Sequence, residues 1–187
     1  MHTFLIFGIL NILIIVASWR SLFTIKSHGF YRFFGWEGIA WLFAVNYKAW
    51  LLNPFSLNQI LSWILMTIAY YLVIAGLLLM RKLGKANKTR NEKTLFQFEQ
   101  TTELIDSGIF KYIRHPLYAS LIYLTWGIYL KNPDIELFLV SIISTLFLIL
   151  TSLCDEKECI HYFGDKYKAY IKRSKRFIPF IIEIETS

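Results

Sequence analysis

The sequence predicts an all-α, polytopic transmembrane protein with about five membrane-spanning helices. Hydrophobic residues make up 56% of the chain, charged residues only 18%, and the mean hydropathy is +0.46. A soluble domain typically carries about 25% charged residues, so this deficit indicates a surface that faces lipid. Five apolar segments also follow one another along the chain, and most charged residues lie between them.

Four of the apolar segments contain no charged residue, and the three longest of these are 3–18, 55–80 and 137–154. A transmembrane helix needs about 20 apolar residues, with a range of about 17 to 25. The first segment has no basic stretch before it and no cleavage site of the A-x-A type, so we expect a retained helix rather than a signal peptide.

The other two segments, 33–52 and 117–130, are less regular. Glu37 and Lys48 stand near the ends of the first, where long side chains can reach the membrane interface. The second has 14 residues and would rise only about 21 Å as a helix. It either starts before Pro116, sits partly within the cytosolic surface, or is shielded by neighbouring helices.

Charge distribution favours five spans over four. Basic residues concentrate in 19–32, in 81–116 and in the tail after residue 154, and five spans place all three segments on one side. The positive-inside rule then predicts an external N-terminus and a cytosolic C-terminus. We attribute the net charge of +7 to this topology and to anionic lipid headgroups, and expect no nucleic-acid partner.

The predicted organisation has three parts: three N-terminal spans over 1–80, a cytosolic link over 81–107, and a C-terminal hairpin and tail over 108–187. Cys154 and Cys159 are interpreted as small apolar fillers rather than a disulfide. His and Cys spacing indicates no metal site, and no nucleotide-binding or nucleophile-elbow motif occurs.

Candidate functional residues gather at two places. Arg114 and His115 precede an apolar helix whose first turn suits Pro116, and Asp155 and Glu156 follow the next apolar segment. The turn between the two segments is short, which predicts an antiparallel hairpin that brings both pairs to one membrane-edge pocket. Simpler readings stay open for each: positive-inside, capping or solvated side chains, and packing roles for His161, Tyr167 and Tyr170.

The C-terminal part resembles the isoprenylcysteine carboxyl methyltransferase and phospholipid methyltransferase superfamily. The stretch SGIFKYIRHPLYASL, an acidic pair, FGDKYKAY and KRFIP follow the superfamily's order over about 75 residues. The matching positions are Gly108, Phe110, Arg114, His115, Pro116, Tyr118, Asp155, Glu156, Phe163, Gly164, Tyr167, Tyr170, Arg176 and Pro179.

The resemblance implies a cytosolic pocket for S-adenosylmethionine, formed by the C-terminal part, and a lipophilic or lipidated methyl acceptor from the membrane. Arg114 would hold the cofactor carboxylate, Glu156 would accept hydrogen bonds from its hydroxyl or amino groups, and the Tyr118 ring would pack on it. The expected cofactor-binding residues are Gly108, Tyr112, Arg114, His115, Pro116, Tyr118, Asp155 and Glu156, and the expected catalytic residues are Arg176 and Glu156.

Two departures from the superfamily pattern bear on the substrate. The first residue of the acidic pair is Asp155 instead of glutamate, and the link lacks a tryptophan often found there. The acceptor therefore stays open among a carboxylate, which needs no base, and an amine, thiol or hydroxyl, for which His115 or Glu156 would be the base. An NADPH-dependent membrane reductase and a non-catalytic membrane protein are the alternatives.

Overall fold

The computed structural model describes residues 2–25, 27–85, 99 and 101–179, and every regular element in these residues is helical. The all-α prediction is therefore confirmed for this part of the chain. The elements are α1 (His2–Leu22), α2 (His28–Asn46), α3 (Leu57–Leu83), the short 3-10 helix η1 (Gly108–Lys111), α4 (Pro116–Tyr129), α5 (Ile135–Phe163) and α6 (Asp165–Arg173).

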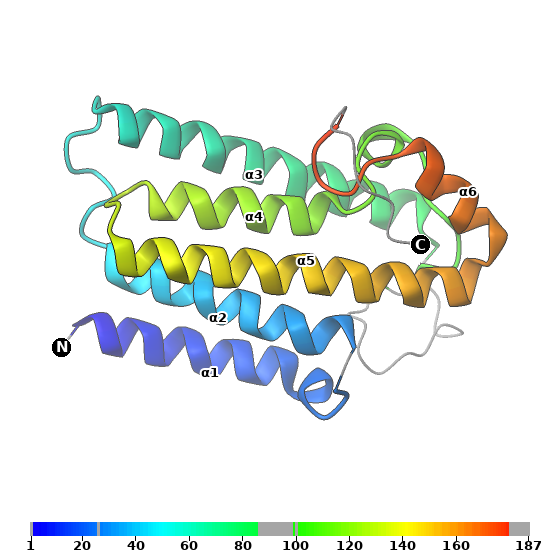
Figure 1. Cartoon of the computed structure of the whole chain (residues 1–187), viewed down its shortest axis with the longest axis horizontal. Helices are drawn as coiled ribbons and strands as arrows, with labels where there is room; N and C mark the ends of the chain where they lie inside the picture. The colour runs from blue at the N-terminus through cyan, green and yellow to red at the C-terminus, as the bar shows by residue number, and fades with distance from the viewer. Residues whose placement is uncertain (1, 26, 86–98, 100, 180–187) are drawn as a thin grey trace.

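The five long helices α1 to α5 lie side by side and alternate in direction (Figure 1). The α2–α3 and α4–α5 turns lie at the same end as the N-terminus. The α1–α2 turn, η1 and α6 lie at the opposite end, which we call the α6 end. The described basic residues of these elements and of the C-terminal ends of α1 and α3, such as Arg20, Lys82, Lys111 and Arg173, therefore share one end of the bundle.

Three helices, α1, α3 and α5, are long and apolar enough to cross a membrane. Only 6% of the apolar window of α1 is buried inside the protein, and its large side chains, such as Phe4 and Val16, are 70% exposed. Apolar surface of this extent is unfavourable in water and suits a lipid environment. The protein is accordingly a membrane protein.

Helix α4 lies in the interior of the bundle, where it packs against α2, α3 and α5. Ala119 and Thr125 on this helix are fully buried. It begins at Pro116 and not earlier, so of the three alternatives for this short segment the structure favours shielding by neighbours.

The predicted position of Glu37 near the end of a helix is wrong. Helix α2 starts at His28 because the Ser27 side chain accepts a hydrogen bond from the Phe30 backbone N–H at 3.2 Å, a typical N-cap. Glu37 consequently lies near the middle of α2. There the Asn11 side chain of α1 donates a 2.7 Å hydrogen bond to its carboxyl group, which ties the two helices together.

Helices α2 and α5 approach closely because small residues line their contact. A Cβ atom added at Gly38 would lie 2.8 Å from the Ser144 Cβ, and one at Gly35 would lie 2.9 Å from Leu148. The Ser144 hydroxyl donates to the Gly35 carbonyl at 2.8 Å. Close backbone approach and such polar contacts hold helices together where lipid removes the hydrophobic driving force.

Substituting Gly38 by valine should destabilise the protein by about 1 to 3 kcal/mol, because the added atoms force α2 away from α5. The matched control is Gly8→Val on α1, where an added Cβ meets no atom within 4 Å. Thermal unfolding of both variants in detergent measures the difference. Equal melting temperatures for the two would contradict the close α2–α5 packing.

Candidate functional site

Glu156 is the centre of a buried ionic network at the α6 end. Its side chain is only 9% exposed, and three cationic side chains reach it. The Arg114 Nε donates to Oε1 at 2.9 Å, the His115 Nε2 lies 3.2 Å from the same oxygen, and the Arg176 Nη2 lies 2.9 Å from Oε2. Three positive charges around one carboxylate stabilise its ionised form.

Arg114 connects this carboxylate to the C-terminal tail. Its side chain is 2% exposed, and Nη1 donates to the backbone carbonyls of Ser174 and of Ile171, the latter at 3.3 Å. The guanidinium thus joins α5 to the end of α6. Since these donors are directed at protein groups, Arg114 has a structural function whether or not it also contacts a ligand.

His115 lies between the two residues of the acidic pair. Its Nδ1 is 3.3 Å from the Asp155 carboxylate and its Nε2 is 3.2 Å from Glu156. Burial alone would lower the pKa of His115, but the hydrogen bonds to Asp155 and Glu156 raise it above the usual value. We therefore expect an imidazolium, which stacks on the Tyr118 ring with centroids 5.5 Å apart.

The chain before α4 is shaped by glycine, proline and the tail. Gly108 has φ of 60°, and a Cβ there would also lie 2.6 Å from Leu79, so only glycine suits this close turn. Pro116 occupies the first turn of α4. The tail pairs alongside: the Arg114 N–H donates to the Lys175 carbonyl at 2.7 Å, and the Lys175 N–H donates to the Tyr112 carbonyl at 2.9 Å.

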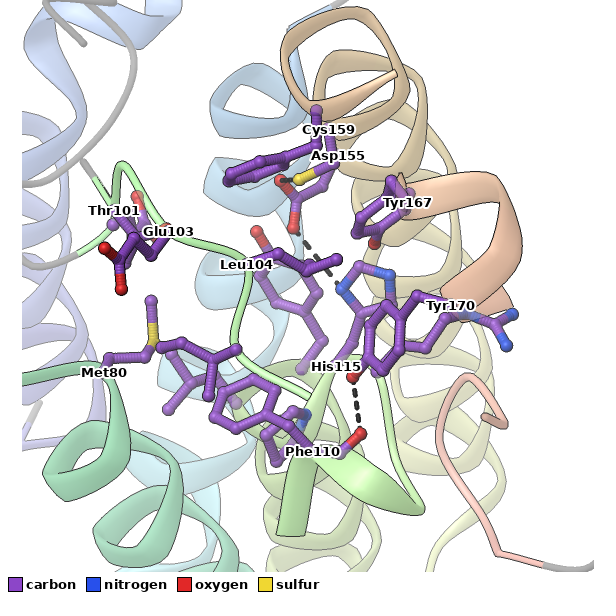
Figure 2. A pocket seen from close by; sticks show the side chains of 17 residues that line it. Met80, Thr101, Glu103, Leu104, Phe110, His115, Asp155, Cys159, Tyr167 and Tyr170 are labelled. Atoms are coloured by element: carbon purple, nitrogen blue, oxygen red, sulfur yellow. Dashed lines mark hydrogen bonds and ion pairs between the residues drawn. The ribbon is translucent and has the colours of Figure 1, made fainter. Parts of the chain in front are cut away.

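A pocket opens beside His115 (Figure 2). Its cavity volume is about 100 Å³, and the open space at the mouth extends the empty volume to about 690 Å³. The lining residues come from α3, the end of the link, η1, α4, α5 and α6. They are Met80, Glu99, Thr101, Glu103, Leu104, Ile105, Phe110, Arg114, His115, Pro116, Leu117, Tyr118, Asp155, Cys159, Phe163, Tyr167 and Tyr170.

Two tyrosines of α6 close one side of this pocket. Tyr167 and Tyr170 are 3% and 2% exposed, and the Tyr170 hydroxyl donates to the Phe110 carbonyl at 2.5 Å (Figure 2). Burial raises the pKa of both hydroxyls, so they stay protonated at neutral pH. They are packing residues and pocket residues at once.

The sequence-predicted site residues fall into three groups. Arg114, His115, Pro116, Tyr118 and Asp155 line the pocket. Glu156 and Arg176 lie in the ionic network beside it. Gly108 and Tyr112 shape the chain before α4, and Tyr112 is 47% exposed.

The wall contributed by the link was missed by sequence reasoning. Glu99, Thr101, Glu103 and Leu104 line the pocket, although the predicted cytosolic link offered no motif there. The hydrogen bond from the Thr102 N–H to the Gly84 carbonyl, 3.0 Å long, returns the chain to the end of α3. The available signal in the sequence was the apolar group Leu95, Phe96 and Phe98, which is unusual for a plain polar linker.

A second charged cluster, also unpredicted, joins α2 to the pocket. The His28 ring is fully buried, and its Nδ1 lies 2.6 Å from the Glu158 carboxylate. The potential ligand atoms of His28, Asp155 and Glu158 all lie within 4.8 Å of one another. Arg32 is 2% exposed and pairs with Glu99 at 2.6 Å. No sequence motif connects residues so far apart in the chain.

Because of His28, the protein should become less stable as the pH rises above neutral. His28 is the first residue of α2 and lies outside the apolar segment 33–52. Burial lowers the pKa of His28, but the hydrogen bonds with Glu158 and Glu99 outweigh this effect and raise the pKa to about 10. The protonated ring stabilises the fold fully at pH values below the pKa of about 6.5 that histidine has in the unfolded chain. This contribution is lost as the pH rises towards the pKa of His28 in the folded protein. Melting temperature should therefore fall between pH 7 and pH 10, and less so in His28→Gln. Parallel profiles for the two proteins would contradict a buried imidazolium.

Comparison of the sequence with known proteins identifies the family to which these residues belong. Residues 57–166 match the family model described as phospholipid methyltransferase. Human protein-S-isoprenylcysteine O-methyltransferase is 30% identical over 130 residues, which cover 67% of this chain and 44% of the relative. Methanethiol S-methyltransferase 1 of Bradyrhizobium diazoefficiens is 23% identical over 185 residues, covering 95% of this chain and 53% of the relative.

The rat protein-S-isoprenylcysteine O-methyltransferase is 30% identical over 73% of this chain and 57% of its own length. The chain thus spans about half the length of the curated relatives it matches. No solved structure matches significantly. The matched segment contains α3, η1, α4, α5 and most of the pocket wall. The resemblance seen in the sequence is therefore confirmed, and the chain belongs to the phospholipid methyltransferase family.

Proposed function

We propose that this protein is an integral membrane methyltransferase that transfers a methyl group from S-adenosylmethionine to a lipophilic acceptor. The observation that carries the proposal is the pocket at the α6 end, whose wall joins His115, Asp155 and Tyr118 within the family-matched segment. The names of the relatives support the reaction class.

The chemistry of the pocket fits such a cofactor. S-adenosylmethionine has a carboxylate, an ammonium group, hydroxyl groups and an aromatic base. The described pocket wall offers the cations Arg114 and His115, the carboxylates Glu99 and Asp155, and the Tyr118 ring. When bound, the cofactor would supply a methyl group activated by a positively charged sulfur and open to in-line attack by the acceptor.

The residues of the chain would act mainly by alignment and by exclusion of water. His115, fixed from both sides by Asp155 and Glu156, presents a rigid cationic wall. Arg114 keeps Glu156 and the tail in place, which makes it a positioning residue as well as a wall residue. Arg176 is 18% exposed beside Glu156, and we retain it as the group that orients the acceptor.

The ion pairs favour an acceptor that is already ionised. The two bases considered from the sequence are both engaged: His115 faces two carboxylates, and Glu156 is paired with three cations. Neither is suited to remove a proton, because each is stabilised in its charged form. A carboxylate is ionised at neutral pH and needs no base, and we propose a carboxylate as the methyl acceptor.

For the membrane we propose five spans, with α2 and α4 crossing beside the three long apolar helices. The α6 end would face the cytosol because the described basic residues that flank the helices gather there. The pocket wall includes apolar Met80 and Leu117 from the adjoining ends of α3 and α4. A lipophilic acceptor would approach from the membrane past these helices.

Calorimetric titration with S-adenosylhomocysteine tests the cofactor. The detergent-purified protein should bind saturably, and Asp155→Asn should weaken binding at least about tenfold, since it loses a charge that holds His115. Asp165→Asn is the matched control, because the Asp165 side chain is 93% exposed. Absence of binding by the folded wild-type protein would overturn the methyltransferase proposal, and NADPH would be titrated next.

The topology is tested by labelling single cysteines in sealed vesicles, in a Cys154→Ala, Cys159→Ala background. Lys111→Cys lies at the α6 end and Asn132→Cys lies in the α4–α5 turn, both on exposed residues. In intact right-side-out vesicles an impermeant maleimide should label only the Asn132→Cys variant. Equal labelling of both positions would contradict the five-span proposal.

A further inference from the structure

Helix α2 contributes two buried cations to the neighbourhood of the pocket, although it lies outside the family-matched segment 57–166. His28 is fully buried and Arg32 is 2% exposed. Cations are rarely buried so completely unless they are paired. Both side chains reach a single pocket residue, Glu99, at the end of the link.

Two side chains of α2 hold the Glu99 carboxylate in place. Arg32 Nη1 lies 2.6 Å from its Oε1, and His28 Nε2 lies 3.8 Å from its Oε2. The Glu99 side chain stays 10% exposed and lines the pocket. Because this carboxylate is partly exposed on the pocket wall, it is accessible to a hydrogen-bond donor of a ligand.

A second carboxylate of the pocket, that of Asp155, lies close to His28. The His28 Nδ1 bonds to Glu158, and Asp155 lies within the same 4.8 Å cluster. Asp155 lines the pocket together with Glu99. The pocket therefore has an acidic wall, anchored on α2, in addition to the cationic wall formed by Arg114 and His115.

We propose that Glu99 binds the ammonium group of the methyl donor's amino-acid part, and that Arg32 and His28 are positioning residues that hold Glu99 for this contact. An ammonium group has three N–H donors, whereas a sulfonium has none, so a carboxylate discriminates for the ammonium. The inference rests on the proposed function. It assigns binding of the donor in part to a helix outside the segment that identifies the family.

The test compares two ligands in calorimetric titrations. S-adenosylhomocysteine carries the ammonium group, whereas 5′-methylthioadenosine lacks the whole amino-acid part. Glu99→Gln should weaken binding of the first about tenfold or more, as for loss of a hydrogen bond to a charged group, and leave binding of the second unchanged. Glu136→Gln, on an exposed residue at the far end of the bundle, is the control.

Arg32→Gln tests the positioning role. It should weaken S-adenosylhomocysteine binding in the wild-type background but have little further effect when combined with Glu99→Gln, because the two residues act through one contact. Additive losses in this double-mutant cycle would overturn the positioning role. If Arg32→Gln fails to fold, His28→Gln replaces it in the cycle.

The remaining outcomes are also decisive. Equal weakening of both ligands by Glu99→Gln would show a general structural effect and overturn the ammonium contact, as would no weakening at all. Failure of the wild-type protein to bind either ligand would instead refute the proposed function. The two proposals therefore fail in different measurements.

Discussion

The arrangement of the α6 end depends on one buried carboxylate, Glu156. It holds Arg114 and His115 at the start of α4 and Arg176 in the tail, so three separate segments meet at one side chain of α5. Removing one partner of such a buried network typically costs about 3 to 5 kcal/mol, because the other charges stay buried without compensation. The same contacts place His115, Asp155 and Tyr118 on the pocket wall.

The helical bundle makes this network possible because it fixes the positions of α4 and α5 relative to each other. Their short turn makes them antiparallel neighbours, and glycine and serine contacts bring α2 against α5. Since lipid gives little driving force for helix association, close packing and interhelical hydrogen bonds carry the arrangement. The hydrogen bond between Asn11 of α1 and Glu37 of α2 is one such interhelical contact.

Much of this could be predicted from the sequence, for reasons that are local. Charge-free runs reveal α1, α3 and α5, and a short turn predicts that Arg114 and His115 meet Asp155 and Glu156. The start of α2 was misplaced because the predicted segment began at residue 33, whereas the helix begins at His28 after the cap Ser27. The start of the helix contains the polar residues His28 and Arg32, so a search for apolar residues alone excludes it. Their contacts with Glu158 and Glu99 span 130 and 67 positions, so no local pattern could indicate them.

We propose that the methyl donor binds between the cationic wall of Arg114 and His115 and the acidic wall of Glu99 and Asp155. An experimental structure of the protein with S-adenosylhomocysteine tests it most directly. We expect ligand density inside this pocket, with the amino-acid part beside Glu99 and the adenosine part towards Tyr118. Density at another place on the protein, with this pocket empty at saturating ligand, would show that the donor does not bind here.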